Sequence, residues 1–168
     1  MAQSISGSLE IRYRQTYNNV LDLETFSSSL DERIQQAFTN GTGANKAQAS
    51  WTDRRSLLTT TSEEIDLRAL TNGFGTLTAT KIKTLIIRVR TTTPGYRLLV
   101  GGAASNAWEA WTTQTGSIIR VGAGSQLMIS DWIDGLIVDA THKMLKIENP
   151  SGGTVEYDII VLCEGSVA

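Results

Sequence analysis

Residues 81–100 read KIKTLIIRVRTTTPGYRLLV and include the most apolar run of the chain. Leu85, Ile87 and Val89 alternate with polar or charged residues, and only Ile86 interrupts the pattern. A period of two residues indicates a strand with one buried face, and Ile86 indicates that the other face is half covered, as in a central strand. The TTTPG segment favours a turn, and the five residues after it predict a returning strand. The stretch therefore predicts a hairpin at the centre of the core.

Shorter strand candidates punctuated by Gly-containing turns occupy the rest of the chain. They lie at residues 51–61, 63–67, 118–121, 126–129, 137–139, 144–147 and 155–162. Short strands at a spacing near ten residues are typical of an antiparallel sandwich or barrel. We expect an all-β, jelly-roll-like antiparallel β-sandwich over residues 46–168. Its core is expected to contain Leu85, Ile87, Val89, Leu99, Ile159 and Val161.

Residues 1–45 are expected to form an extended N-terminal arm or hairpin. Residues 4–14 alternate apolar with charged side chains, which predicts a strand with an exposed charged face. Asn18-Asn19 predicts a turn, and residues 20–23 form a second apolar piece. Residues 29–38 are ambiguous: a capping box favours a helix slightly, whereas a strand would have a poor buried side.

Composition sets the broad class of the protein. The 168 residues carry a net charge of −2, with a sequence pI near 5.4, which argues against a nucleic-acid-binding domain. No apolar run approaches the roughly 18 residues of a membrane span, and the N-terminus does not resemble a signal peptide. We therefore expect a protein made and kept in a reducing compartment. The single cysteine, Cys163, is expected to be a small buried hydrophobe.

The sequence shows no pattern that carries catalysis. His142, the only histidine, lies in an expected loop without a recognisable nucleophile nearby. Asp131, Asp134 and Asp139 lack the spacing of an EF-hand, although they offer ligands for a hard cation. The GxG at residues 41–43 lacks the rest of a phosphate-binding loop. We predict no catalytic residue, no cofactor, no bound metal and no enzymatic activity.

The tryptophans leave two alternatives open. They are Trp51, Trp108, Trp111 and Trp132. Core packing is the default in a sandwich, and a carbohydrate platform or a subunit interface is the alternative. If Trp108 and Trp111 share a strand, their odd spacing turns them to opposite faces. One would then line the core while the other meets a partner.

Several short motifs resemble those of a family of small virion structural proteins of tailed bacteriophages, of the capsid cement or decoration type. They are SGSL at residues 6–9, NGTGA at 40–44, WTDR at 51–54, EEIDL at 63–67 ahead of Phe74-Gly75, VGGAASNAW at 100–108 and TVEYDIIVLCEG at 154–165. The resemblance covers nearly the whole chain. It favours a strand for residues 29–38, which is the assignment we adopt.

The resemblance implies a virion location and two possible positions in the particle. The first is a cement protein on the capsid surface that bridges shell subunits, with the major capsid protein and neighbouring copies of itself as partners. The second is a tail or tail-tip component that binds a carbohydrate or receptor. Assembly would take place in the host cytoplasm, without membrane or direct nucleic-acid contact. Because the apolar side chains of the arm need cover, we also expect self-association, as a homotrimer.

Overall fold

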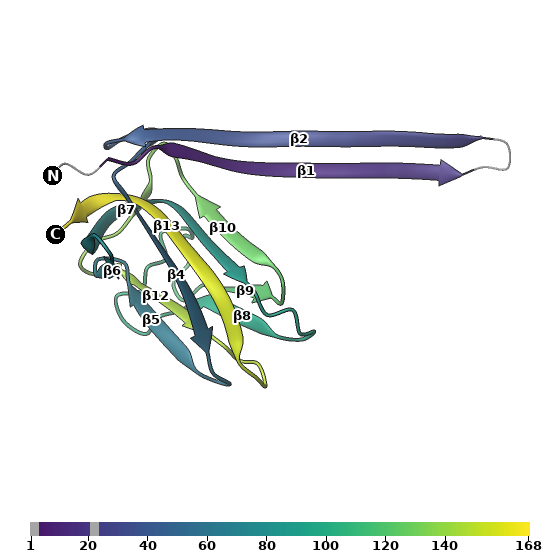
Figure 1. The fold of residues 1–168 in the computed structure, drawn as a ribbon. Helices are drawn as coiled ribbons and strands as arrows, with labels where there is room; N and C mark the ends of the chain where they lie inside the picture. Colours follow the sequence, from purple (N-terminus) through teal and green to yellow (C-terminus); the bar gives the residue numbers. More distant parts are fainter. Residues whose placement is uncertain (1–3, 21–23) are drawn as a thin grey trace.

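The computed structural model describes residues 4–20 and 24–168, and the regular structure of this part is entirely β-strand. Figure 1 shows the strands packed into a sandwich from which one long hairpin projects. The strands are β1 (Gly7–Val20), β2 (Thr25–Asn40), β3 (Lys46–Ala47), β4 (Ala49–Leu57), β5 (Ser62–Asp66), β6 (Leu70–Asn72), β7 (Gly75–Val89), β8 (Arg97–Gly101), β9 (Ile118–Gly122), β10 (Gln126–Ser130), β11 (Leu136–Ile137), β12 (Met144–Glu148) and β13 (Val155–Val167).

Two antiparallel sheets form the sandwich. One has the order β10-β7-β13-β4, with β6 and β11 added along β7, and the other has the order β5-β12-β8-β9. Apart from β8 and β9, consecutive long strands lie in different sheets, and β4 and β13 are neighbours although they begin and end the sandwich. The jelly-roll-like arrangement stays a prediction. The predicted all-β antiparallel sandwich is confirmed.

The core lies between the two sheets and follows the alternation of the strands. Leu85, Ile87, Val89, Ile159 and Val161 are buried, as predicted. The prediction for Leu99 is wrong, because this side chain is only half buried. Its neighbours Leu98 and Val100 are the buried residues of β8. The YRLLV segment has apolar residues at successive positions, so the sequence left the inward side of the strand undetermined.

The predicted central hairpin is also wrong, because β7 and β8 belong to different sheets. The TTTPG segment therefore connects the two layers. After β7, the Arg90 N–H donates to the carbonyl of Glu156 at 2.8 Å, and the Gly124 N–H donates to the carbonyl of Thr91 at 2.9 Å. Alternation predicts which side of a strand is buried, but two strands facing each other across a core have the same pattern as two paired strands.

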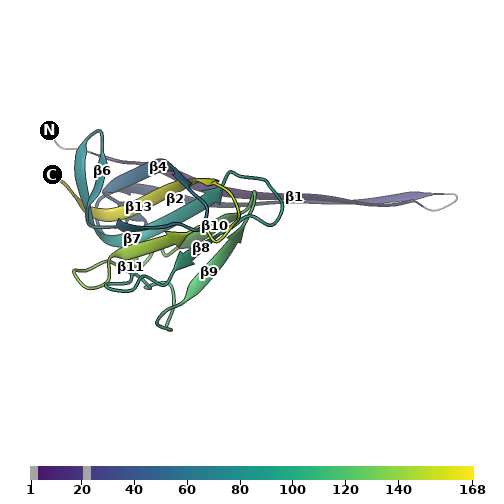
Figure 2. The same cartoon turned by 90° about the horizontal axis from the view of Figure 1, so that it is seen from below.

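β1 and β2 pair without a register shift from Gly7–Phe38 to Val20–Thr25. The strand adopted for residues 29–38 is confirmed as part of β2. The turn predicted at Asn18-Asn19 is wrong, since both residues lie within β1. Val20 ends β1, and the rest of the second apolar piece, residues 21–23, lies outside the described residues. Figure 2 shows the sandwich at one end of the molecule and the hairpin extending away from it.

We expect Ile159→Ala to lower the free energy of unfolding by about 2–5 kcal/mol, since it deletes part of a fully buried side chain and leaves a cavity. Ile160→Ala is the matched control, because Ile160 lies next on β13 and is 38% exposed. Its expected loss is about 1 kcal/mol or less. Equilibrium unfolding in urea measures both values, and equal losses would contradict the inward orientation of Ile159.

Candidate functional site

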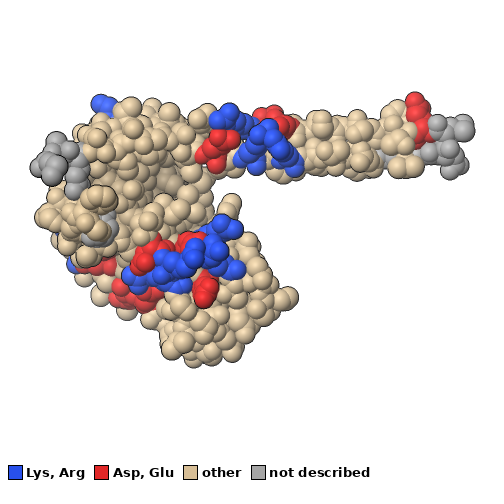
Figure 3. All heavy atoms as spheres, in the orientation of Figure 1, with Lys and Arg blue, Asp and Glu red and all other residues tan. Residues whose placement is uncertain are grey.

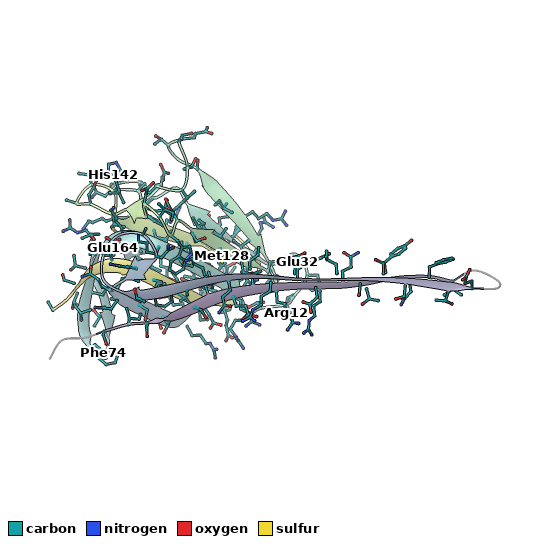
Figure 4. The ribbon with its side chains drawn as sticks, turned by 90° about the horizontal axis from the view of Figure 1, so that it is seen from above. Arg12, Glu32, Phe74, Met128, His142 and Glu164 are labelled. Atoms are coloured by element: carbon teal, nitrogen blue, oxygen red, sulfur yellow. The ribbon has the colours of Figure 1, made fainter. Side chains whose placement is uncertain are left out.

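The hairpin has two chemically different faces. Residues paired across an antiparallel ribbon point to the same side, so Ile11 shares a side with Ile34, and Gln15 shares it with Leu30. We name this side the apolar face. Glu32 is the only charged residue on its described part, and Figure 4 shows Glu32 and Arg12 on opposite sides of the ribbon. The apolar face carries Leu9, Ile11, Tyr13, Tyr17, Phe26, Leu30, Ile34 and Phe38.

The opposite side, the charged face, carries a network of ion pairs that joins the two strands. The Arg12 guanidinium donates to both carboxylate oxygens of Asp31, at 2.8 and 2.5 Å. Arg14 approaches Asp31 at 3.4 Å, and Arg33 donates to Glu10 at 2.8 Å. The hydrogen bond from Arg12 holds the pKa of Asp31 below its usual value. Figure 3 shows these opposite charges clustered on the proximal half of the hairpin.

Most of the apolar face is exposed to solvent. Six of its side chains are between 39% and 68% exposed: Ile11, Tyr13, Tyr17, Phe26, Leu30 and Ile34. Only its base is partly covered, where Leu9, Gln36 and Phe38 are half buried. A continuous row of aliphatic and aromatic side chains facing water is typical of an interaction site. This row is the strongest candidate for a functional surface in the described residues.

The base of the hairpin is attached to the turn between β10 and β11. Phe38 stacks on Trp132 with 5.6 Å between ring centroids. The Asn45 N–H donates to the carbonyl of Trp132 at 2.8 Å, and the amide of Gln36 donates to the Asn45 side chain at 2.8 Å. Asn45 has a φ of 56°, a left-handed conformation that asparagine tolerates. The NGTGA loop therefore positions β2 against the sandwich.

A buried ion pair lies beneath this attachment. Lys83 on β7 is fully buried, and its Nζ lies 3.0 Å from Oε1 of Glu164 on β13. Lys83 also donates to the carbonyl of Ile133 at 3.3 Å. The Gly43 N–H donates to the same Glu164 oxygen at 2.9 Å. Two sandwich strands and two loops therefore meet at one pair of opposite charges.

The surroundings of Glu164 favour its ionised form. Burial raises the pKa of this carboxyl group, but the hydrogen bond from the Gly43 N–H and the interactions with Lys83 outweigh it. The net result is a pKa below the usual value of 4.5. No pattern in the sequence identified Lys83 and Glu164 as a pair.

The outer face of the sheet formed by β10, β7, β13 and β4 carries a second charged area. Asp158 accepts hydrogen bonds from Arg54 at 2.8 Å and from Arg90 at 3.1 Å. These contacts hold the pKa of Asp158 below its usual value, with the Arg54 hydrogen bond as the largest cause. Figure 3 shows charges of both signs mixed over this face. Because they alternate, they create no extended field of one sign.

An open cleft of about 600 Å³ lies between the β8–β9 loop and the β11–β12 loop. His142 lies at its rim and is exposed, as predicted. An Asp139 oxygen accepts hydrogen bonds from the Thr141 and His142 N–H groups at 2.7 and 2.8 Å, and lies 3.1 Å from the His142 ring. These hydrogen bonds, from Thr141 above all, lower the pKa of Asp139. The carboxylate stabilises its own turn.

The structure does not gather the candidate cation ligands. Asp131 accepts hydrogen bonds from the Ile133 and Asp134 N–H groups at 3.1 and 3.0 Å, which closes its own turn. Asp139 lines the cleft described above. Among the residues that the structure describes, no group of three or more His, Cys, Asp or Glu side chains could hold a metal ion. Cys163 is buried as expected, and burial raises the pKa of its thiol to about 12.

The tryptophans are mainly structural. Trp51 and Trp108 are buried, as the core alternative predicted, and their ring N–H groups donate to the carbonyls of Thr71 and Ile137. The idea that Trp108 and Trp111 turn to opposite faces is wrong. They lie in the β8–β9 loop, outside any strand, and their rings meet edge to face at 4.8 Å. Trp132 belongs instead to the hairpin base.

Comparison with known proteins assigns no family to the chain. No family model matches it, and no curated protein is significantly similar to it. The resemblance to phage virion proteins stays a prediction. In the described ranges, no helix has the length and apolar character that a membrane crossing needs.

We expect Glu164→Gln to lower the free energy of unfolding by about 3–5 kcal/mol, because it leaves the fully buried Lys83 without its counter-charge. Glu148→Gln is the matched control, since Glu148 pairs with Lys146 at 2.8 Å in a partly exposed position. Loss of that pair is expected to cost less than about 1 kcal/mol. Equilibrium unfolding in urea at neutral pH measures both. Similar losses for the two variants would show that the buried pair adds nothing beyond a surface pair.

The same carboxyl group predicts a pH dependence. Because the folded pKa of Glu164 lies below its usual 4.5, the unfolded chain takes up the proton first as the pH falls. Its contribution is therefore complete above about pH 4.5 and is lost as the pH falls through the folded pKa. Between about pH 6 and about pH 3, Glu164→Gln should lose less stability than the wild type. Other carboxyl groups titrate in both proteins and cancel in the difference, so equal losses would contradict the assignment.

Proposed function

We propose that this chain is a non-enzymatic structural protein of a bacteriophage virion, and that it acts as a cement or decoration protein of the head shell. The observation that carries the proposal is the combination of a self-contained sandwich with a long hairpin whose apolar face is exposed. The sequence motifs quoted above, which resemble those of small phage virion proteins, supply the biological setting. The hairpin supplies the means of contact.

The dimensions of the hairpin suit a bridging role. A strand of fourteen residues, such as β1, is about 45 Å long at about 3.4 Å per residue. The sandwich buries its own core and does not need the hairpin to cover it. An element of this length can therefore contact a neighbouring subunit while the sandwich rests on another. Many copies on a closed shell would then gain avidity from modest individual contacts.

In this proposal, the partners are the major capsid protein and neighbouring copies of the same chain. The location is the capsid surface, after assembly in the host cytoplasm. The sandwich, of jelly-roll type in this proposal, would supply the compact body of each copy. Neither a membrane nor nucleic acid takes part, and no step needs a cofactor.

One observation favours a second candidate, a tail or tail-tip component that binds a carbohydrate or receptor. The cleft near His142 has a volume within the range of small-molecule sites, and polar side chains line part of it. Glu109 and Gln114 are among these side chains. In the cement proposal, this cleft has no ligand and the hairpin makes the contacts.

The number of copies per particle separates the two candidates. A cement protein covers the shell, so quantitative mass spectrometry of purified particles should give a ratio to the major shell protein near one to one, or a simple fraction of it. A tail component is present in only a handful of copies. That result would overturn the cement proposal, whereas absence of the chain from purified particles would overturn a virion role altogether.

A further inference from the structure

The distribution of charge on the hairpin indicates which side is covered by a partner. Five charged side chains lie on the charged face: Glu10, Arg12, Arg14, Asp31 and Arg33. The described part of the apolar face carries one charged residue, Glu32, whereas four aromatic residues and several aliphatic ones share that side. Interface cores are depleted of charge and enriched in aromatic residues. The difference between the two faces therefore marks the apolar face as the buried side of an interface.

The sandwich of the same chain leaves this face open. From Ile11–Ile34 outward, the large apolar side chains are at least 39% exposed, and the register of the two strands is regular. Figure 2 shows the distal part of the hairpin extending beyond the sandwich. A two-stranded hairpin without cover is at best marginally stable in water. The hairpin therefore needs a partner that is present as soon as the chain is made.

We propose that the apolar face of the hairpin binds the same face of a second copy of this chain. The inference deepens the proposed function and rests on it for the setting in which the copies act. Two ribbons packed face to face about 10 Å apart form a small two-layer sandwich with a dry interior. A second copy of the chain is made wherever the first is made, so it is available as a partner at once. Because the apolar face carries almost no charge, its partner does not need a surface of opposite charge.

The available area is sufficient for such a pair. From Ile11–Ile34 outward, each ribbon offers about 34 Å by about 10 Å of flat face, and the side chains that stand on it enlarge this area, so two faces bury on the order of 1,000 Å² in total. That value reaches the lower size limit of specific interfaces. Aliphatic and aromatic side chains are interspersed along the face, so each copy offers both kinds of contact. Every strand of a two-stranded ribbon is an edge strand, so the Glu32 carboxylate can stay in water beside the covered face.

The test measures the mass of the purified full-length chain by light scattering, between about 10 and about 100 µM. The wild type should have a mass of at least two chains, that is, at least twice 18.2 kDa. The double variant Tyr17→Glu with Leu30→Glu places two charges on the apolar face and should reduce the mass to that of one chain. Thr16→Glu with Ser29→Glu places the same two charges on the opposite face, at residues paired with each other, and should leave the mass unchanged.

Circular dichroism and urea unfolding should show an intact sandwich in all variants, because the changed residues are exposed on the hairpin. If the charged variant does not fold, Tyr17→Ser with Leu30→Ser removes the apolar contacts without adding charge and should weaken association. A wild-type mass of 18.2 kDa across the range would overturn the inference. Equal loss of association in both charged variants would overturn it too.

A different occupant of the face has its own signature. If the wild type is a monomer and only the apolar-face variant fails to bind purified shells, the face binds the shell protein and the inference is wrong. The light-scattering measurement uses no particle, so its result does not depend on the virion role. The copy number described under the proposed function tests that role separately.

Discussion

The position of the hairpin depends on the buried ion pair between Lys83 and Glu164. A charged ammonium group without water is costly, and the cost is offset only when a counter-charge and further hydrogen-bonding partners surround it. Glu164, the Gly43 N–H and the Ile133 carbonyl supply these partners. Each of these three groups comes from a different segment of the chain. Neutralising the two charges therefore brings together β7, β13, the loop after β2 that contains Gly43, and the turn between β10 and β11 that contains Ile133. The loop that leads out of β2 is thereby fixed at one place on the sandwich.

Part of this pair was visible in the sequence and part was hidden. Extending the alternation of Leu85 and Ile87 by one step would place Lys83 on the buried side of its strand. Glu164 gives no such signal, because Val161 and Cys163 keep the buried side of β13 in alternation, which puts Glu164 on the other side. The register between the strands shifts at Lys83, the extra residue of β7 opposite the step from Leu162 to Cys163, and a sequence pattern with a strict period of two cannot place such a bulge. The sequence therefore offers one inward charge but no sign of its partner.

The same limit explains which other features of the fold were predictable. In β7 and β13, the burial of Leu85, Ile87, Val89, Ile159 and Val161 followed from the alternation in the sequence. Leu99 failed because its strand is short and has three successive apolar residues, and the pairing of β7 failed because alternation does not distinguish a neighbour from a strand in the opposite layer. In residues 29–38, the helical capping signal was local. Pairing with β1 along the whole of β2 supplies far more backbone hydrogen bonds than one cap.

The charged face of the hairpin has a further consequence for assembly. A slip of one residue between β1 and β2 would turn half of the apolar side chains to the opposite side. The same slip would put Arg12 and Asp31, and likewise Arg33 and Glu10, on opposite sides of the ribbon, whereas the observed register brings them into contact. Exposed pairs of this kind are weak, yet they discriminate between registers when no core does so. The ion pairs therefore keep the apolar side chains on one surface.

Within the described residues, both outer edges of the distal ribbon lack a strand partner. Covering the apolar face leaves the backbone groups of those edges available, so face-to-face association and strand addition by another subunit would use different atoms.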